Sequence, residues 1–147
     1  MVLCALIIGC HAYAENNING VRVWPAPENT RVVFDLSEKP DYKYFSLSSP
    51  QRLVIDFYDS KSLFSFKNLA KNDRRIAKIR TSTPKSKKSV RVVLELSDNY
   101  RLTVFPLAPV GQYGNRLVVD LHEKKSKRKV VTSDSLQSNR DIVVAIV

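Results

Sequence analysis

In four short stretches of the chain every second position is apolar, and two of the three positions between them are charged. In residues 31–36 every second position is apolar, and the positions between them hold Arg31, Val33 and Asp35. The same alternation recurs in residues 52–57, 91–96 and 116–121. A period of two in a segment rich in β-branched residues is typical of a half-buried β-strand. Each stretch therefore predicts a strand with one face in the core and a polar face outside.

These four stretches form two related pairs. The sequence RVVFDLSE at residues 31–38 resembles RVVLELSD at residues 91–98. The sequence RLVIDF at residues 52–57 resembles RLVVDL at residues 116–121. The offset is 60 in the first pair and 64 in the second, and the extra residues fall in the loop at 109–115. A duplicated unit of this size predicts two equivalent structural halves.

Further segments complete the predicted fold. Four more strands are expected at residues 21–24, 42–47, 76–82 and 100–105. Proline, aspartate, asparagine and serine separate them and are typical of turns. Residues 67–74 are compatible with one short, poorly capped helix. Eight short strands in two equivalent halves predict an all-β fold, a symmetric two-sheet β-sandwich built from a duplicated strand unit.

The polar side of this sandwich carries the candidate functional residues. Arginine forks grip carboxylates with two hydrogen bonds, and acidic side chains accept hydrogen bonds from sugar hydroxyls or amides. The candidate ligand-binding residues are Arg22, Arg31, Arg52, Asp56, Arg91, Arg116 and Asp120. The alternative is cross-strand ion pairing without a ligand, because opposed strands set arginine beside an acid. Trp24 and Tyr58 are candidate stacking surfaces, with packing at the core or rim as the alternative.

The net charge of +10 is spread unevenly along the chain. Residues 61–88 carry ten basic side chains and one acidic side chain, whereas the predicted sheets are close to neutral. A basic surface attracts polyanions. For an exported protein, an anionic cell-wall polymer or a lipid head group is the expected partner. Nucleic acid is not, because the sheets lack a basic stripe with interleaved aromatic residues. A solvated face that keeps the protein soluble is the alternative.

Residues 1–14 are predicted to be a secretory signal peptide. An uncharged apolar run at residues 2–9 is too short to span a membrane and precedes the sequence Ala-Tyr-Ala at residues 12–14. No basic residue precedes the run, which indicates that a basic leader is missing. One alternative is a lipobox ending at Cys10, which would tether a lipoprotein. Another is a buried strand of the fold. No transmembrane segment is expected once the signal is removed.

Five sequence motifs occur in order along residues 20–123. They are VRVWPA at 21–26, TRV at 30–32, SPQRLVID at 49–56, LAPV at 107–110 and RLVVDL at 116–121. Together they resemble the AMIN domain, a module of periplasmic N-acetylmuramoyl-L-alanine amidases of Gram-negative bacteria that also occurs in type IV pilus secretins. The resemblance implies a symmetric β-sandwich in the periplasm that binds peptidoglycan and directs its enzyme to the division site.

The resemblance also suggests a domain organisation. The AMIN-like domain is expected at residues 15–123, followed by a basic, serine-rich, flexible linker at residues 124–140. Residues 141–147 resemble the first strand of the amidase catalytic domain, which would make the chain truncated before that domain. The alternative is a terminal strand added to the sandwich. Position 147 is Val where the family has Asp.

Catalytic chemistry is expected outside this chain. The implied parent enzyme uses zinc to activate water against the amide bond. No cofactor, metal ligand or catalytic residue is expected here, since His11 lies in the signal and His122 stands alone at a strand end. The predicted function is therefore a non-catalytic, peptidoglycan-binding and septal-targeting module, with divisome proteins as further partners. The alternative is a protein-interaction module of a pilus secretin or of the divisome.

Overall fold

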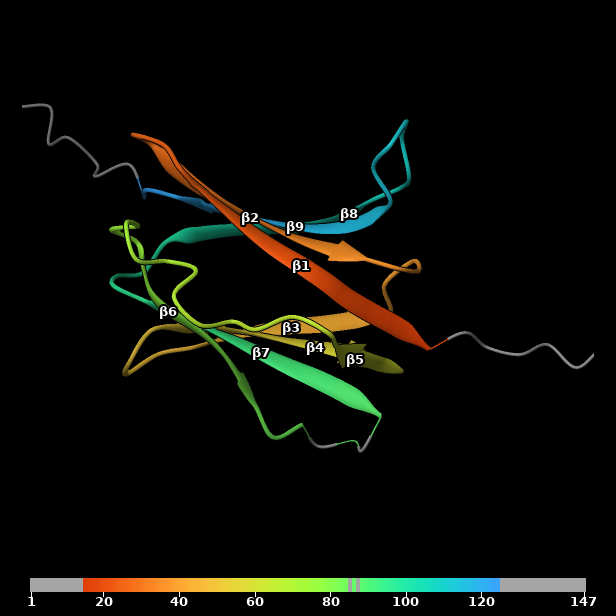
Figure 1. The fold of residues 1–147 in the computed structure, drawn as a ribbon. Helices are drawn as coiled ribbons and strands as arrows, with labels where there is room; N and C mark the ends of the chain where they lie inside the picture. Colours follow the sequence, from red (N-terminus) through yellow and green to blue (C-terminus); the bar gives the residue numbers. More distant parts are fainter. Residues whose placement is uncertain (1–14, 85, 87, 125–147) are drawn as a thin grey trace, which may run out of the picture.

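The computed structural model describes residues 15–84, 86 and 88–124 of the chain, which form two β-sheets (Figure 1). The nine strands within these residues are β1 (Asn16–Pro25), β2 (Asn29–Leu36), β3 (Tyr42–Leu47), β4 (Arg52–Tyr58), β5 (Ser60–Ser62), β6 (Ile76–Ser82), β7 (Ser89–Leu96), β8 (Arg101–Leu107) and β9 (Asn115–His122). The predicted all-β sandwich is confirmed. The predicted signal peptide, nearly all of the predicted linker and the expected strand at 141–147 lie outside the described residues.

The helix expected at residues 67–74 is wrong, because this segment forms turns. Asn68 has a φ of 61°, a left-handed conformation that an α-helix cannot contain. The Asp73 carboxylate accepts hydrogen bonds from the backbone N–H groups of Arg75 and Ile76 at 2.8 and 2.7 Å. These bonds lead the chain directly into β6. The short strand β5, which was not predicted, pairs in parallel with the start of β1.

Each sheet combines strands from both halves of the repeat. The five-stranded sheet has the order β5-β1-β2-β9-β8, and the four-stranded sheet has the order β3-β4-β7-β6 (Figure 1). Each half therefore contributes one pair of strands to one sheet and its second pair to the other sheet. Without the short strand β5, the order β1-β2-β9-β8 corresponds strand by strand to β6-β7-β4-β3. The two halves are thus equivalent, as predicted, and each sheet is completed by a pair of strands from the other half.

The equivalence extends to the register of individual residues. Arg31 lies opposite Asp120 in the five-stranded sheet, and Arg91 lies opposite Asp56 in the four-stranded sheet. The pairing of β1 with β2 shifts between Ile18 and Gly20, and that of β6 with β7 shifts between Ile76 and Lys78. Because a β-bulge re-aims every following side chain, a bulge at the same place in both halves preserves their equivalence.

The core lies between the two sheets and is built from the predicted apolar positions. Phe34 of β2 and Phe57 of β4 are fully buried, with their ring centroids 5.3 Å apart. Burying a side chain of this size contributes about 1.5–3 kcal/mol to folding. The outward-facing valines are buried as well (Val33, Val54, Val93 and Val118). Long polar side chains on neighbouring strands thus shield the centre of each outer face from water.

Candidate functional site

The seven predicted site residues lie on the outer faces of the two sheets. The five-stranded sheet carries Arg22, Arg31, Arg116 and Asp120, and the four-stranded sheet carries Arg52, Asp56 and Arg91. The alternation of side chains along each strand places them there, on the side opposite the core. The structure therefore divides the predicted site into two separate faces.

Two of the arginines are held by carboxylates of the neighbouring strand. Arg31 donates from Nε and Nη2 to the two carboxylate oxygens of Asp120, both at 2.7 Å. Arg91 makes the same bidentate pair with Asp56, at 2.6 and 2.7 Å. These hydrogen bonds raise the pKa of both arginines above the ordinary value. The cross-strand ion pairing considered from the sequence is thus present, and it occupies these four side chains.

The arginines of the equivalent strands β1 and β6 also pair with a carboxylate. Arg22 on β1 donates from Nε and Nη2 to Asp35 at 3.0 and 2.6 Å. Arg80 on β6 donates from Nε to Glu95 at 2.6 Å. Arg80 occupies the position equivalent to Arg22, yet the sequence reasoning missed it. Equivalent residues of β1 and β6 differ by 58 in residue number, and the same difference aligns the two bulges. This offset is the signal that identifies Arg80.

Arg52 and Arg116 are the two equivalent arginines with free forks. Arg52 lies opposite Glu95, and Arg116 lies opposite Asp35, but each of these carboxylates bonds to the arginine on its other side. The only hydrogen bonds of Arg52 and Arg116 among the described residues run from Nε to Pro50 O at 3.4 Å and to Gly114 O at 3.3 Å. Their terminal nitrogens are available to an incoming carboxylate.

The two faces differ in their exposed aromatic rings. On the five-stranded sheet the guanidinium of Arg22 lies 4.9 Å from the centre of the Trp24 ring. The guanidinium of Arg116 lies 5.1 Å from that of Tyr113. The two rings are 46% and 48% exposed. Ser82 takes the position equivalent to Trp24 on the other sheet, opposite Arg91. Tyr58, the second predicted stacking residue, is half-buried at the end of β4.

Arg75, which the sequence reasoning did not single out, is a fully buried arginine that closes one end of the sandwich. Its Nη1 donates to Ala26 O at 3.0 Å and to Thr30 Oγ1 at 3.2 Å. Its Nη2 donates to Pro27 O at 2.6 Å and to Glu123 Oε1 at 3.0 Å. These bonds join the segment before β6 to the turn between β1 and β2. Arg75 therefore has a structural role and does not face a ligand.

Neither a cluster of metal-binding side chains nor a membrane-spanning helix is found among the residues that the structure describes. Among the residues that the structure describes, no group of three His, Cys, Asp or Glu side chains gathers where it could hold a metal ion. The described part of the chain does not fit a zinc centre, and no metal-dependent step is assigned to it. The same part contains no helix that is long and apolar enough to cross a membrane.

The chain resembles known proteins over the region of the sandwich. A family model described as the AMIN domain matches residues 20–121. An N-acetylmuramoyl-L-alanine amidase AmiC from Escherichia coli O6:H1 is 36% identical over 118 residues, covering 74% of this chain and 27% of the relative. An N-acetylmuramoyl-L-alanine amidase AmiC from Neisseria meningitidis serogroup B is 35% identical over 107 residues, covering 69% and 25%. The chain spans about a quarter of the length of these relatives.

Proposed function

Because the chain belongs to the AMIN domain family, we propose that it is a non-catalytic peptidoglycan-binding module that targets a cell-wall amidase to the division site. The observation that carries this proposal is the pair of equivalent outer faces, on which the equivalent Arg52 and Arg116 have no carboxylate partner among the described residues. Peptidoglycan carries carboxylates on its stem peptides, and arginine binds carboxylates bidentately.

In this proposal the paired side chains and the free arginines have different roles. The Arg31–Asp120 and Arg91–Asp56 pairs hold their side chains in place on each face through two hydrogen bonds each. Arg52 and Arg116 make the contacts with the wall. Because the two faces point away from each other, one domain binds two neighbouring strands of the polymer. Binding at two places raises the overall affinity for a repetitive ligand above that of either face.

The compartment and the partners of the module follow from this function. The module acts in the periplasm, where the wall is accessible, and divisome proteins are further proposed partners. Zinc-dependent hydrolysis of the amide bond is assigned to the catalytic part of the parent amidase, not to the residues described here. A role as a protein-interaction module of a pilus secretin stays the alternative.

Co-sedimentation of the full chain with purified sacculi tests this function. We expect the wild-type chain to pellet with the wall and the double variant Arg52→Gln/Arg116→Gln to bind at least tenfold more weakly. Charge-assisted hydrogen bonds of about 1.5–3 kcal/mol are lost on each face. The matched control is Lys39→Gln/Lys88→Gln, which removes the same charge from exposed positions.

Two results would contradict the proposal. If the wild-type chain stays in the soluble fraction at low salt, the domain does not bind the wall. If the control variant loses as much binding as the arginine variant, only diffuse electrostatic attraction is at work.

A further inference from the structure

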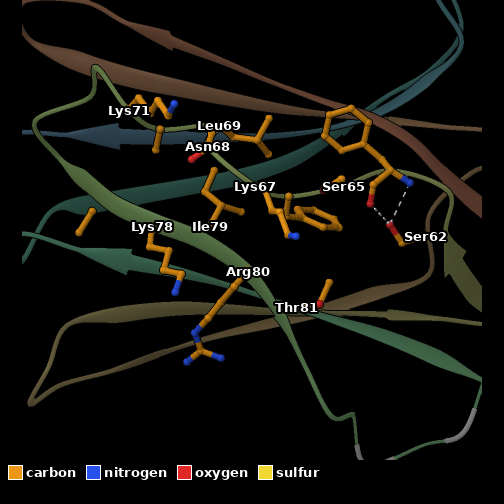
Figure 2. A pocket seen from close by; sticks show the side chains of 14 residues that line it. Ser62, Ser65, Lys67, Asn68, Leu69, Lys71, Lys78, Ile79, Arg80 and Thr81 are labelled. Carbon is orange, nitrogen blue, oxygen red and sulfur yellow. Dashed lines mark hydrogen bonds between the residues drawn. The ribbon is translucent and has the colours of Figure 1, made fainter.

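A basic groove lies beside β6, the edge strand of the four-stranded sheet. It has a volume of about 660 Å³ and is bounded by β6 residues 77–81 on one side and by the segment 62–71 on the other. Figure 2 shows Lys78 and Arg80 on β6 and Lys67 on the facing segment around this hollow. The groove lies at an edge of the four-stranded sheet, and its lining includes neither Arg52 nor Arg116, the proposed wall contacts.

The backbone of β6 is unpaired on the side of the groove. β6 pairs with β7 along one edge only, and no backbone hydrogen bond joins residues 77–81 to the segment 62–71. A free strand edge presents a row of N–H and C=O groups that can accept another extended chain. The groove therefore offers main-chain partners as well as side chains.

The side chains along the groove alternate in the manner of a strand. Lys78 and Arg80 lie on the polar outer side of β6, whereas Ile79 lies on its inner side and is buried. The inner side of the groove also contains the apolar Phe64 and Leu69, both of which pack against the core. An added strand would place every second residue beside cations and the residues between them beside apolar side chains.

The charge of the groove is one-sided. Its lining includes Lys67, Lys71, Lys78 and Arg80 and no acidic residue. Of these four cations, only Arg80 has an ion-pair partner among the described residues, which is Glu95. Like charges on the edge disfavour pairing with a second copy of the same strand, whereas an acidic strand is attracted. The equivalent strand β1 has Gly20 in place of Lys78, so the groove is a feature of one half only.

We propose that this groove binds an extended segment of a partner protein in which acidic and apolar residues alternate. The segment adds to the four-stranded sheet as a strand beside β6. Its carboxylates lie next to Lys78 and Lys67, and its apolar side chains lie next to Ile79, beneath the segment 62–71. This site goes beyond wall binding and would supply a docking point for a regulatory or divisome partner.

The probe that tests this proposal is a capped octapeptide of alternating L-Glu and L-Val residues, titrated into the full chain at low salt. We expect binding, with changes in amide chemical shift concentrated in residues 77–81. A peptide of alternating Lys and Val is expected not to bind. The Glu-Val peptide with N-methyl groups at alternate residues keeps its charge but loses N–H donors, and it is expected to bind at least fivefold more weakly.

Two charge-matched double variants locate the site. We expect Lys67→Gln/Lys78→Gln to weaken peptide binding about fivefold, the effect of losing two exposed ion pairs. The control, Lys39→Gln/Lys43→Gln, removes two exposed lysines at and beside β3, the opposite edge of the same sheet, and is expected to change binding less than twofold. Neither double variant should alter co-sedimentation with sacculi. A failure of the proposed peptide site is therefore distinguishable from a failure of the proposed wall function.

Three outcomes would overturn the proposal. The first is the absence of binding by the Glu-Val peptide. The second is equal binding of the N-methylated peptide or an equal loss in the control variant, which would show diffuse attraction without strand addition. The third is displacement of the peptide by soluble peptidoglycan fragments that shift the same amides, which would make the groove a wall site.

Discussion

At the scale of single residues, the same arginine–acid pattern produces pairs with different energetic roles. The Asp120 side chain is 8% exposed and bonds to Arg31, whereas the Arg22 and Asp35 side chains are 39% and 35% exposed. A buried carboxylate depends on its partner because desolvation penalises the charge. An exposed pair contributes at most about 1 kcal/mol, because water replaces the lost contact.

This contrast predicts different costs for two similar substitutions. Arg31→Ala leaves the Asp120 carboxylate buried without its bidentate partner and should lower the free energy of unfolding by about 2 kcal/mol. Arg22→Ala should lower the free energy of unfolding by less than about 1 kcal/mol. Urea denaturation of both variants measures the difference. Equal costs would mean that burial of Asp120 does not govern the pair.

A second prediction at this scale concerns alkaline pH. Burial raises the pKa of Tyr42 above its ordinary value, and the neighbouring Tyr44 adds to the shift. The folded state therefore holds this proton more tightly than the unfolded state. The resulting stability is present below about pH 10 and is lost as the pH rises through the raised pKa.

The variant Tyr42→Phe tests this pH dependence. It lacks the titrating group, so its free energy of unfolding should fall less between about pH 9 and pH 11 than that of the wild-type chain. Denaturant midpoints across this range give the comparison, with Tyr113→Phe, an exposed tyrosine, as the control. Parallel curves for wild type and Tyr42→Phe would refute the role of Tyr42.

At the scale of elements, the segment between β5 and β6 shows where local sequence is insufficient. Residues 67–74 have a composition compatible with a helix, but the segment forms turns. Within and beside it, Ala70 and Phe66 are buried in the core. Asp73 bonds to Thr30 of β2 at 2.6 Å, and Arg75 bonds to the turn before β2. These partners are more than 40 residues away in sequence, so no local pattern could have indicated them. The same holds for β5, whose three residues exist as a strand only because β1 lies beside them.

At the scale of the whole molecule, exchange of strand pairs makes the halves interdependent. β2 pairs with β9 and β4 pairs with β7, so the centre of each sheet joins the two repeats. Neither half contains a complete sheet. Each half alone would leave an apolar sheet face and a long strand edge exposed to water.

Fragments of the chain test this interdependence. Residues 15–74 and 75–147, produced separately, should each fail to form a folded monomer, and mixing them should restore native structure. Dispersion of the amide NMR spectrum and sedimentation velocity report folding and mass, with the full chain as the control. A cooperatively folded monomer of either fragment would contradict the prediction.

The sequence by itself determined which side of each strand faces the core, because a period of two leaves one register that buries the apolar residues. It also determined that the two halves are equivalent, since the repeated motifs demand the same strands twice. Only the tertiary structure decided which arginine each carboxylate binds. Asp35 and Glu95 each lie between two arginines, and their choice of Arg22 and Arg80 leaves Arg116 and Arg52 free. The groove beside β6 was likewise decided by packing, because it depends on how a long connection folds back along an unpaired edge.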